Sequence, residues 1–275
     1  MQRSTTFSNI VTFWKMSKCW NVDFLCNLRL MSDMNTPLAR SAAKAPSRTL
    51  AETTYVALKE DILTGAALPG KSLLTRELTE RYGCGISPLR EALAKLVAEG
   101  LLEAVSHRGV RVPLPTVEDL NDIYRIRTAL EREALVLAMQ HGDDHWEGQI
   151  LSAAHRLATA PLPENPADGA ALRDWEARHR AFHTCLITAA PAPRLKRLIA
   201  QMVDQTERYR ALRLAHFAPK NIDNFVREHN TLRDAVIARD PAAADLLAAH
   251  FESSRGFVQA YLEASLTAPT GVSDS

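Results

Sequence analysis

Four of the nine histidines could bring their imidazole nitrogens to one point. His179 and His183 are four residues apart, so on a helix both side chains project from the same face. His229 and His250 lie on two later segments that are also expected to be helical. Imidazole nitrogen is a common ligand of divalent ions such as zinc and nickel. A bundle that packs these three helices together could hold one ion, with its remaining coordination positions open to water or an acid.

The spacing alone leaves a plainer alternative open, because a pair of histidines four apart is often an ordinary surface or core feature. The pair is also not the zinc-protease motif. Arg180 stands at the position where that motif carries the glutamate base.

Two arginines and a tyrosine could supply a second anchor for an acid. They are Arg127 in RIRTALE, and Tyr209 and Arg213 in ERYRALR. An arginine that faces the bundle interior needs an anionic partner, since an unpaired buried charge is costly. A small carboxylate is one such partner. The alternative is an internal salt bridge, such as Arg127 with Glu131 one helical turn later.

The first half of the chain has the pattern of a winged helix-turn-helix. Helices are expected at 50–64 and 75–82, and a third helix opens with Ser87 as N-cap and ends before Gly100. Two short strands, 103–105 and 110–112, follow around a hairpin tip. In such a domain the third helix presents its N-terminal end to base edges in the major groove, and the wing flanks it.

Beyond Pro113 and Pro115 the apolar residues recur with a helical period. Thr116 with Asp119 resembles a capping box at the start of a helix. Helices are expected at 116–141, 144–160, 169–190, 193–217, 220–239 and 241–265. An all-helical segment of this size predicts an antiparallel bundle. The expected fold class is therefore mainly α, with a winged helix-turn-helix domain at 49–113 and a helical domain at 116–265.

The composition limits the class of protein but does not identify a binding partner. The chain has 33 basic and 32 acidic residues, and the segment 49–113 has equal numbers of each, so any case for DNA must depend on pattern. Four cysteines without metal-ligand spacing favour a reducing, cytoplasmic location. The apolar stretch near the start is interrupted by Lys15, Lys18 and Asp23, which argues against a membrane span.

Residues 1–48 and 266–275 lack any helical or strand period, and we expect both to be disordered. A reading frame that truly begins at Met31 or Met34 is the alternative for the first segment. In either case residues 1–33 are expected to contribute neither to the fold nor to DNA specificity, since they show no helical or strand period.

The run LLTRELTERYGCGISPLREALAKLVAEGLLEAVSHRGVRV resembles the signature of GntR-type transcriptional regulators over about forty positions. Residues 116–265 resemble the helical effector domain (FCD domain) of the FadR subgroup, and the runs GISPLREAL, HRAFH and ERYR are most similar to its carbon-starvation-induced regulators. The resemblance implies a homodimeric, DNA-binding repressor that senses a small organic acid and reads a palindromic operator.

The same resemblance implies roles for residues of the first domain. Arg76 matches an arginine that contacts the DNA backbone. Ser87 and Arg90 match the start of the recognition helix, and His107, Arg108 and Gly109 match the wing tip. Where the family usually has Ser-Arg, this chain has Gly85-Ile86. One base-reading arginine is therefore missing, and operators of other subgroups should not be transferred to it.

For the second domain the resemblance implies a metal site. Many effector domains of this subgroup hold a divalent ion with Asp-x3-His on one helix and a histidine on each of two later helices. His183, His229 and His250 match the three histidines, and His179 stands where the aspartate is usual. The site is then either a less anionic four-imidazole site or a three-ligand site. Zinc is the first candidate, with nickel or manganese as alternatives.

The expected function is a DNA-binding regulator without enzymatic activity, whose operator affinity responds to a small carboxylate, such as the dicarboxylate glutarate. Two rivals stay open at this point. One is a metal-dependent hydrolase or hydratase that uses the histidines, and the other is a DNA-binding dimeric adaptor without a ligand.

Overall fold

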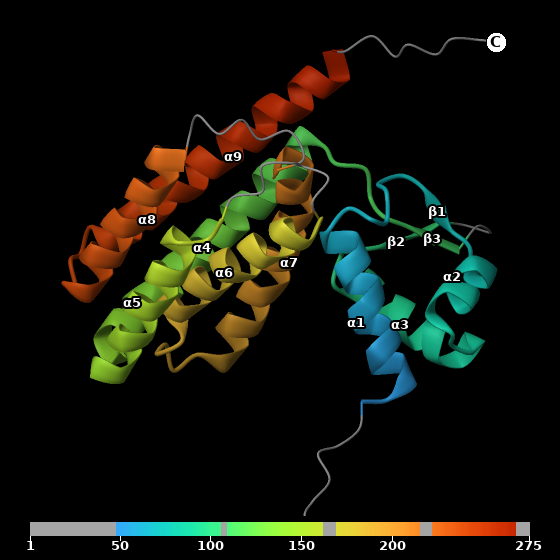
Figure 1. The fold of residues 1–275 in the computed structure, drawn as a ribbon, viewed down its shortest axis with the longest axis horizontal. Coiled ribbons are helices and arrows are strands. Elements are labelled where there is room, and N and C mark those ends of the chain that lie inside the picture. The colour runs from blue at the N-terminus through green and yellow to red at the C-terminus, as the bar shows by residue number, and fades with distance from the viewer. Residues whose placement is uncertain (1–47, 106–108, 162–168, 215–221, 268–275) are drawn as a thin grey trace, which may run out of the picture. The chain divides into compact units, whose positions relative to one another are not determined.

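The computed structural model describes residues 48–105, 109–161, 169–214 and 222–267, and Figure 1 shows the order of their elements. The described residues from 48 onward belong to one compact unit. The expectations about residues 1–47, including a start at Met31 or Met34, lie outside the described residues. The tail expected at 266–275 begins two residues too early, because residues 266 and 267 still belong to the last helix, and the rest lie outside the described residues.

Three helices and a small sheet form the N-terminal domain in the predicted order. They are α1 (Leu50–Leu63), β1 (Ser72–Leu73), α2 (Thr75–Tyr82), α3 (Ile86–Ala98), β2 (Glu103–Val105) and β3 (Gly109–Arg111). Thr49 opens α1 with a capping box: its hydroxyl accepts a hydrogen bond from the Glu52 N–H, and the Glu52 carboxylate accepts one from the Thr49 N–H. Gly83 ends α2 in the left-handed conformation, with φ 57°.

The sheet contains one strand more than the sequence indicated. Its order is β1-β3-β2 and both pairings are antiparallel, so Val110 in the central strand lies between Ala104 and Leu73. The strand β1 was not predicted, because two residues are too few to show an alternating pattern.

The recognition helix α3 begins earlier than its sequence signals indicated. The prediction of Ser87 as N-cap is wrong: Gly85 is the N-cap, and no side chain caps the helix. The Leu89 N–H donates to the Gly85 carbonyl at 3.2 Å, which closes the first turn ahead of Ser87. Pro88 is accommodated because the first-turn residues have no N–H partner within the helix. Ser87 is instead an exposed residue of the first turn.

A single apolar cluster holds α1 and α3 together. Its buried members are Leu58, Ile62, Ala67, Leu78, Cys84, Leu89, Leu96, Leu101, Leu102, Val110 and Val112. Because this cluster fixes α3 along its apolar stripe, the opposite face of the helix and its N-terminal end stay exposed.

Six helices form the second domain, in agreement with the six predicted: α4 (Val117–His141), α5 (Asp144–Ala158), α6 (Gly169–Ile187), α7 (Pro193–Leu214), α8 (Ile222–Ile237) and α9 (Ala243–Thr267). The helix α4 packs against α6, α7 and α9, and α8 packs against α5 and α9. In the parts of this domain that the structure describes, no strand occurs. The fold class predicted from the sequence is confirmed. None of the described helices combines the length and apolar character that crossing a bilayer requires.

The start of α4 forms only half of the predicted capping box. The Thr116 hydroxyl accepts a hydrogen bond from the Asp119 N–H at 3.1 Å. The Asp119 carboxylate does not complete the box, because it accepts hydrogen bonds from the Tyr209 hydroxyl at 2.6 Å and from the Arg208 guanidinium at 3.1 Å. Asp119 thus ties the beginning of α4 to α7.

Candidate metal centre and nucleic-acid interface

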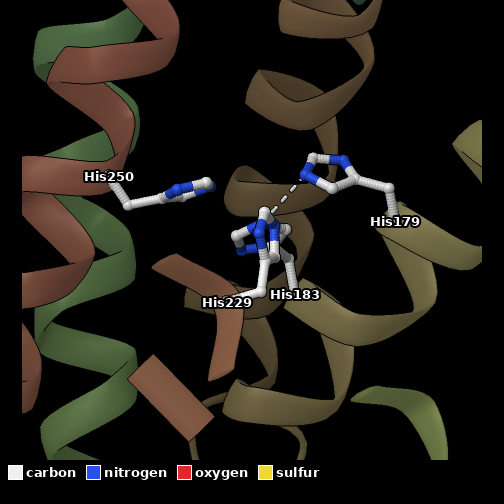
Figure 2. Close-up of side chains that lie close together, drawn as sticks. All are labelled: His179, His183, His229 and His250. Carbon is white, nitrogen blue, oxygen red and sulfur yellow. Dashed lines mark hydrogen bonds between the residues drawn. The ribbon is translucent and has the colours of Figure 1, made fainter. Parts of the chain in front are cut away.

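The four histidines singled out by spacing converge in the interior of the bundle (Figure 2). His179 and His183 project from α6, His229 from α8 and His250 from α9, and all four are buried. One ring nitrogen from each residue lies within 4.8 Å of those of the other three. The expectation that three helices would bring these side chains together is confirmed.

Two of the rings are oriented by partners outside the cluster. His229 Nδ1 lies 2.8 Å from the Phe225 carbonyl oxygen, and His250 Nδ1 lies 3.0 Å from a Glu228 carboxylate oxygen. A backbone carbonyl can only accept a hydrogen bond. The hydrogen bond from His250 lowers the pKa of Glu228 and keeps it ionised, so this carboxylate also can only accept. Each Nδ1 therefore carries the proton, and Nε2 carries the lone pair. Metal-binding histidines are commonly oriented in this way, by a hydrogen-bond acceptor at the ring nitrogen that does not bind the metal.

The other two rings leave buried nitrogen atoms without partners. The Nε2 atoms of His179 and His183 are 3.1 Å apart, while the Nδ1 atoms of both rings and His229 Nε2 have no hydrogen-bond partner. Buried polar atoms without a partner are rare in folded proteins. Two nitrogens bound to one ion at about 2.0–2.1 Å are separated by about 3 Å. The spacing and the unpaired Nε2 of His229 both fit a bound divalent cation.

Burial lowers the pKa of all four histidines, and the positive charge of nearby Arg210 lowers each of them further. All four rings are therefore neutral near pH 7, which is the form that binds metal. Trp175 stacks on the His179 ring, with centroids 5.1 Å apart and planes 8° apart, and fixes its orientation. The residues fit a divalent ion held by neutral nitrogen ligands, and they leave its charge uncompensated within the ligand set.

A small cavity of about 90 Å³ lies beside the cluster, lined by His179 and His183 together with Arg127 and Arg210. Arg127 makes the internal salt bridge foreseen as the alternative: its Nε donates to Glu131 at 2.6 Å, and both side chains are 2% exposed. Its guanidinium also lies 4.2 Å from the centre of the Phe251 ring. Arg127 is thus paired and at the same time borders the cavity.

The other two predicted ligand contacts are placed differently. Tyr209 is fully buried, but its hydroxyl binds Asp119 and the Thr116 backbone at the start of α4. Arg213 belongs to α7, and its side chain lies outside the described part of the structure.

Sequence reasoning missed Arg210 and Glu228. Arg210 is buried and donates to Glu176 at 2.9–3.2 Å, while its guanidinium borders the cavity. It lies in the same ERYR run as Tyr209, and a helical projection of α7 could have indicated it. Glu228 is adjacent to His229 in the sequence but binds His250 on another helix, and no sequence signal could have shown that pairing.

The predicted DNA-contacting residues of the first domain are open to solvent where the structure describes them. Arg90 is exposed on the first half of α3, and Arg76 is exposed on α2, where it pairs with Glu80 at 3.2 Å. Gly109 begins β3 with φ 88°, and His107 and Arg108 lie outside the described residues. An exposed cation at the start of a recognition helix is positioned to contact DNA.

The lowered histidine pKa values predict how the metal-free protein responds to acid. Between about pH 5 and 6.5 the unfolded chain binds protons that the folded chain excludes, so the free energy of unfolding falls as the pH falls. The slope should approach about 1.4 kcal/mol per pH unit for each buried histidine. Urea unfolding in the presence of a chelator at pH 5, 6, 7 and 8 measures it. A His145→Gln variant, at an exposed position, should keep the slope. A free energy that does not change between pH 5 and 7 would contradict the neutral, buried state of the four rings.

Glu228 should tune the metal affinity through His250. We expect Glu228→Gln to weaken zinc binding about 10–100-fold, because the amide orients the imidazole less strongly and adds no negative charge. Competition with a chromophoric chelator measures the affinity. Glu252→Gln is the matched control, since Glu252 is an exposed carboxylate paired with Arg255. Equal zinc affinities of the wild type and Glu228→Gln would remove Glu228 from the site.

Two family models match the chain, one for each domain. Residues 50–112 match the model "Bacterial regulatory proteins, gntR family", and residues 122–253 match the FCD domain. The HTH-type transcriptional repressor GlaR of Escherichia coli (strain K12) is 36% identical over 199 residues, which cover 71% of this chain and 90% of GlaR. The HTH-type transcriptional regulator BphR of Paraburkholderia xenovorans (strain LB400) is 35% identical over 215 residues, covering 78% of this chain and 87% of BphR.

Among solved structures, E. coli McbR/YncC superposes with a TM-score of 0.67 at 22% identity, over 78% of this chain and all of McbR/YncC. At this identity the likeness shows the fold alone. The family models and the relatives describe transcriptional regulators and not enzymes, which supports the regulator over the metal-dependent hydrolase or hydratase. The chain belongs to the GntR family of bacterial transcriptional regulators and carries the FCD domain of the FadR subgroup.

Proposed function

We propose that this regulator is a homodimeric repressor whose affinity for a palindromic operator changes when a small carboxylic acid binds beside a metal ion in the FCD domain. The relative GlaR is described as a repressor, which supports this direction of control. An acid can shift operator binding only if it binds one arrangement of the two domains better than another.

One observation carries the proposal: two buried guanidinium groups and two histidines of the candidate metal centre border the same cavity. A divalent ion held by neutral imidazoles keeps its positive charge, which favours an anion in a coordination position that the histidines leave open. Arg127 and Arg210 add positive charge on the cavity wall. An acid with one carboxylate on the ion and the rest of the molecule near the arginines satisfies both.

The size of the cavity favours a short acid. Its volume of about 90 Å³ is that of roughly three water molecules at about 30 Å³ each. A dicarboxylate such as glutarate needs more room. We expect this room to become available when Arg127 or Arg210 leaves its glutamate partner and binds a carboxylate of the ligand instead. The runs GISPLREAL, HRAFH and ERYR are similar to those of carbon-starvation-induced regulators, and this resemblance implies a dicarboxylate. Zinc is the ion we propose first, with nickel or manganese as alternatives.

Tyr209 is better assigned to the α4–α7 connection than to the ligand, since its hydroxyl is engaged by Asp119. Arg210 takes its place in the proposed pocket. Arg213 stays a predicted contact.

The DNA-binding half of the proposal depends on Arg90. We expect Arg90→Ala to cost about 1–3 kcal/mol of operator binding if the arginine reads a base, and to relax sequence preference at that position. Fluorescence anisotropy with a duplex selected from a randomised pool measures both. Arg125→Ala is the control, because Arg125 is an exposed arginine of α4. Unchanged affinity and preference in Arg90→Ala would overturn this assignment.

Acid binding should raise the melting temperature of the zinc-loaded protein. Glutarate at a hundred times its dissociation constant should stabilise the folded state by about 2.7 kcal/mol. We expect the shift to vanish after chelation and in a His183→Ala/His229→Ala double variant that still folds. If no mono- or dicarboxylate shifts the melting curve, the acid-sensor proposal fails and the ligand-free adaptor is the better account. A shift that persists without metal would show that the ion is not the anchor.

A further inference from the structure

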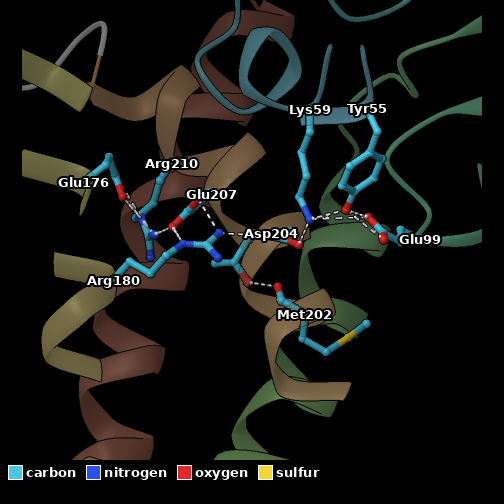
Figure 3. A network of polar contacts seen from close by, with 10 residues as sticks. Tyr55, Lys59, Glu99, Glu176, Arg180, Met202, Asp204, Glu207 and Arg210 are labelled. Atoms are coloured by element: carbon cyan, nitrogen blue, oxygen red, sulfur yellow. Dashed lines mark hydrogen bonds and ion pairs between the residues drawn. The ribbon is translucent and has the colours of Figure 1, made fainter. Parts of the chain in front are cut away.

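A continuous series of ion pairs runs from the cavity to the DNA-binding domain (Figure 3). Arg210 borders the cavity and contacts Glu207 at 3.4 Å. Glu207 accepts two hydrogen bonds from Arg180, both at 2.6 Å, and Arg180 also donates to Asp204 at 2.5 Å. The second oxygen of Asp204 pairs with Lys59 on α1. We call these five residues the ion-pair chain.

The last residue of the ion-pair chain, Lys59, contacts the end of the recognition helix α3. Lys59 also pairs with Glu99 at 3.3 Å, and Glu99 is the C-cap residue of α3. Tyr55 donates its hydroxyl hydrogen bond to the Glu99 carboxylate and receives one from Lys59 at 3.0 Å. Gln205, the neighbour of Asp204 on α7, donates to the Glu99 carbonyl at 2.8 Å. One residue of the FCD domain, Gln205, thus contacts the C-terminal end of α3 directly, and Asp204 reaches it through Lys59.

We infer that the ion-pair chain Arg210–Glu207–Arg180–Asp204–Lys59 transmits occupancy of the cavity to the end of the recognition helix. The inference rests on the proposed function, because it requires that an anion enter the cavity. It assigns a regulatory role to Lys59 and Asp204, and to Arg180, which also borders the cavity beside the histidines.

Charge balance gives the transmission a direction. Arg210 is shared by Glu176 and Glu207, and a ligand carboxylate competes with both. A buried carboxylate that loses its cation is strongly destabilised, so Glu207 must then depend on Arg180 alone. When Arg180 is drawn to Glu207, Asp204 keeps only Lys59. The pull on Lys59 weakens its contact with Glu99 and releases the end of α3.

The surroundings of the chain allow this exchange of partners. A cavity of about 550 Å³ lies between α1 and the helices α6 and α7, and Lys59, Arg180, Asp204 and Glu207 line it. Burial lowers the pKa of Lys59, but the hydrogen bonds to Asp204 and Tyr55 and the negative charges of Asp204 and Glu99 together outweigh it and raise the pKa. The charges therefore persist at neutral pH, and the side chains border open space into which they can move without repacking an apolar core.

The experiment uses the zinc-loaded full chain and measures two quantities for each variant: the glutarate affinity by calorimetry, and the ratio of operator dissociation constants with and without saturating glutarate. Coupling between sites commonly changes affinity about 5–150-fold. In Lys59→Met we expect that ratio to fall below about twofold while glutarate affinity stays within about threefold of the wild type. Arg178→Met, a partly exposed ion-paired arginine on the same helix as Arg180, should keep the wild-type ratio. A full ratio in Lys59→Met would overturn the inference.

A second measurement needs no acid and separates this inference from the proposed function. Glu207→Gln keeps the size of the side chain but removes its charge, and we expect it to change operator affinity at least about threefold. In a Lys59→Met background the same substitution should have almost no effect, because residues coupled through one network are not additive. Equal effects of Glu207→Gln in both backgrounds would show that Glu207 and Lys59 are not coupled, and this result would overturn the inference. If the wild type does not bind glutarate but Glu207 and Lys59 are coupled, the proposed ligand is wrong and the coupling through the ion-pair chain is still supported.

Discussion

Four neutral imidazoles packed into the interior of a helical bundle are the constraint on which the second domain depends. Each ring has left water, and at least three ring nitrogens have no partner in the protein. Such atoms are costly to bury, and protonation cannot relieve them because burial and the nearby arginine charge lower the pKa of every ring. A divalent cation would give the Nε2 atoms of His179, His183 and His229 a partner, since it binds the neutral form of the rings and needs no water inside the bundle.

The same interior contains more charge than an apolar core would carry. Arg127, Arg210, Glu131 and Glu207 are all buried, and each is paired within the bundle. Buried pairs of this kind add little net stability compared with well-packed apolar residues, so their presence argues for a role beyond stability. The proposed regulation by a ligand depends on ion pairs of this kind exchanging one carboxylate for another.

Much of the fold could be predicted from the sequence because its boundaries are marked by proline, glycine and capping residues. The six helices of the FCD domain and the three of the DNA-binding domain follow those signals closely. The exceptions have local physical causes. The strand β1 is too short to show a period. The N-cap of α3 is Gly85 and not Ser87, since the Leu89 N–H bonds to the Gly85 carbonyl and closes the first turn ahead of Ser87. The histidine spacing predicted that His179 and His183 would lie together, since i and i+4 residues share a helix face. The roles of Arg210 and Glu228 depend on contacts between helices, and the sequence of one helix does not show which neighbour its side chains meet.

X-ray absorption at the zinc edge of the reconstituted full-length protein tests the central claim most directly. The account predicts one zinc per chain with a first shell of nitrogen at about 2.0–2.1 Å and the outer-shell scattering of several imidazole rings. The scattering from imidazole should decrease in a His229→Ala variant that still folds. A first shell that contains sulfur, or a protein that retains no zinc after dialysis at neutral pH, would contradict it.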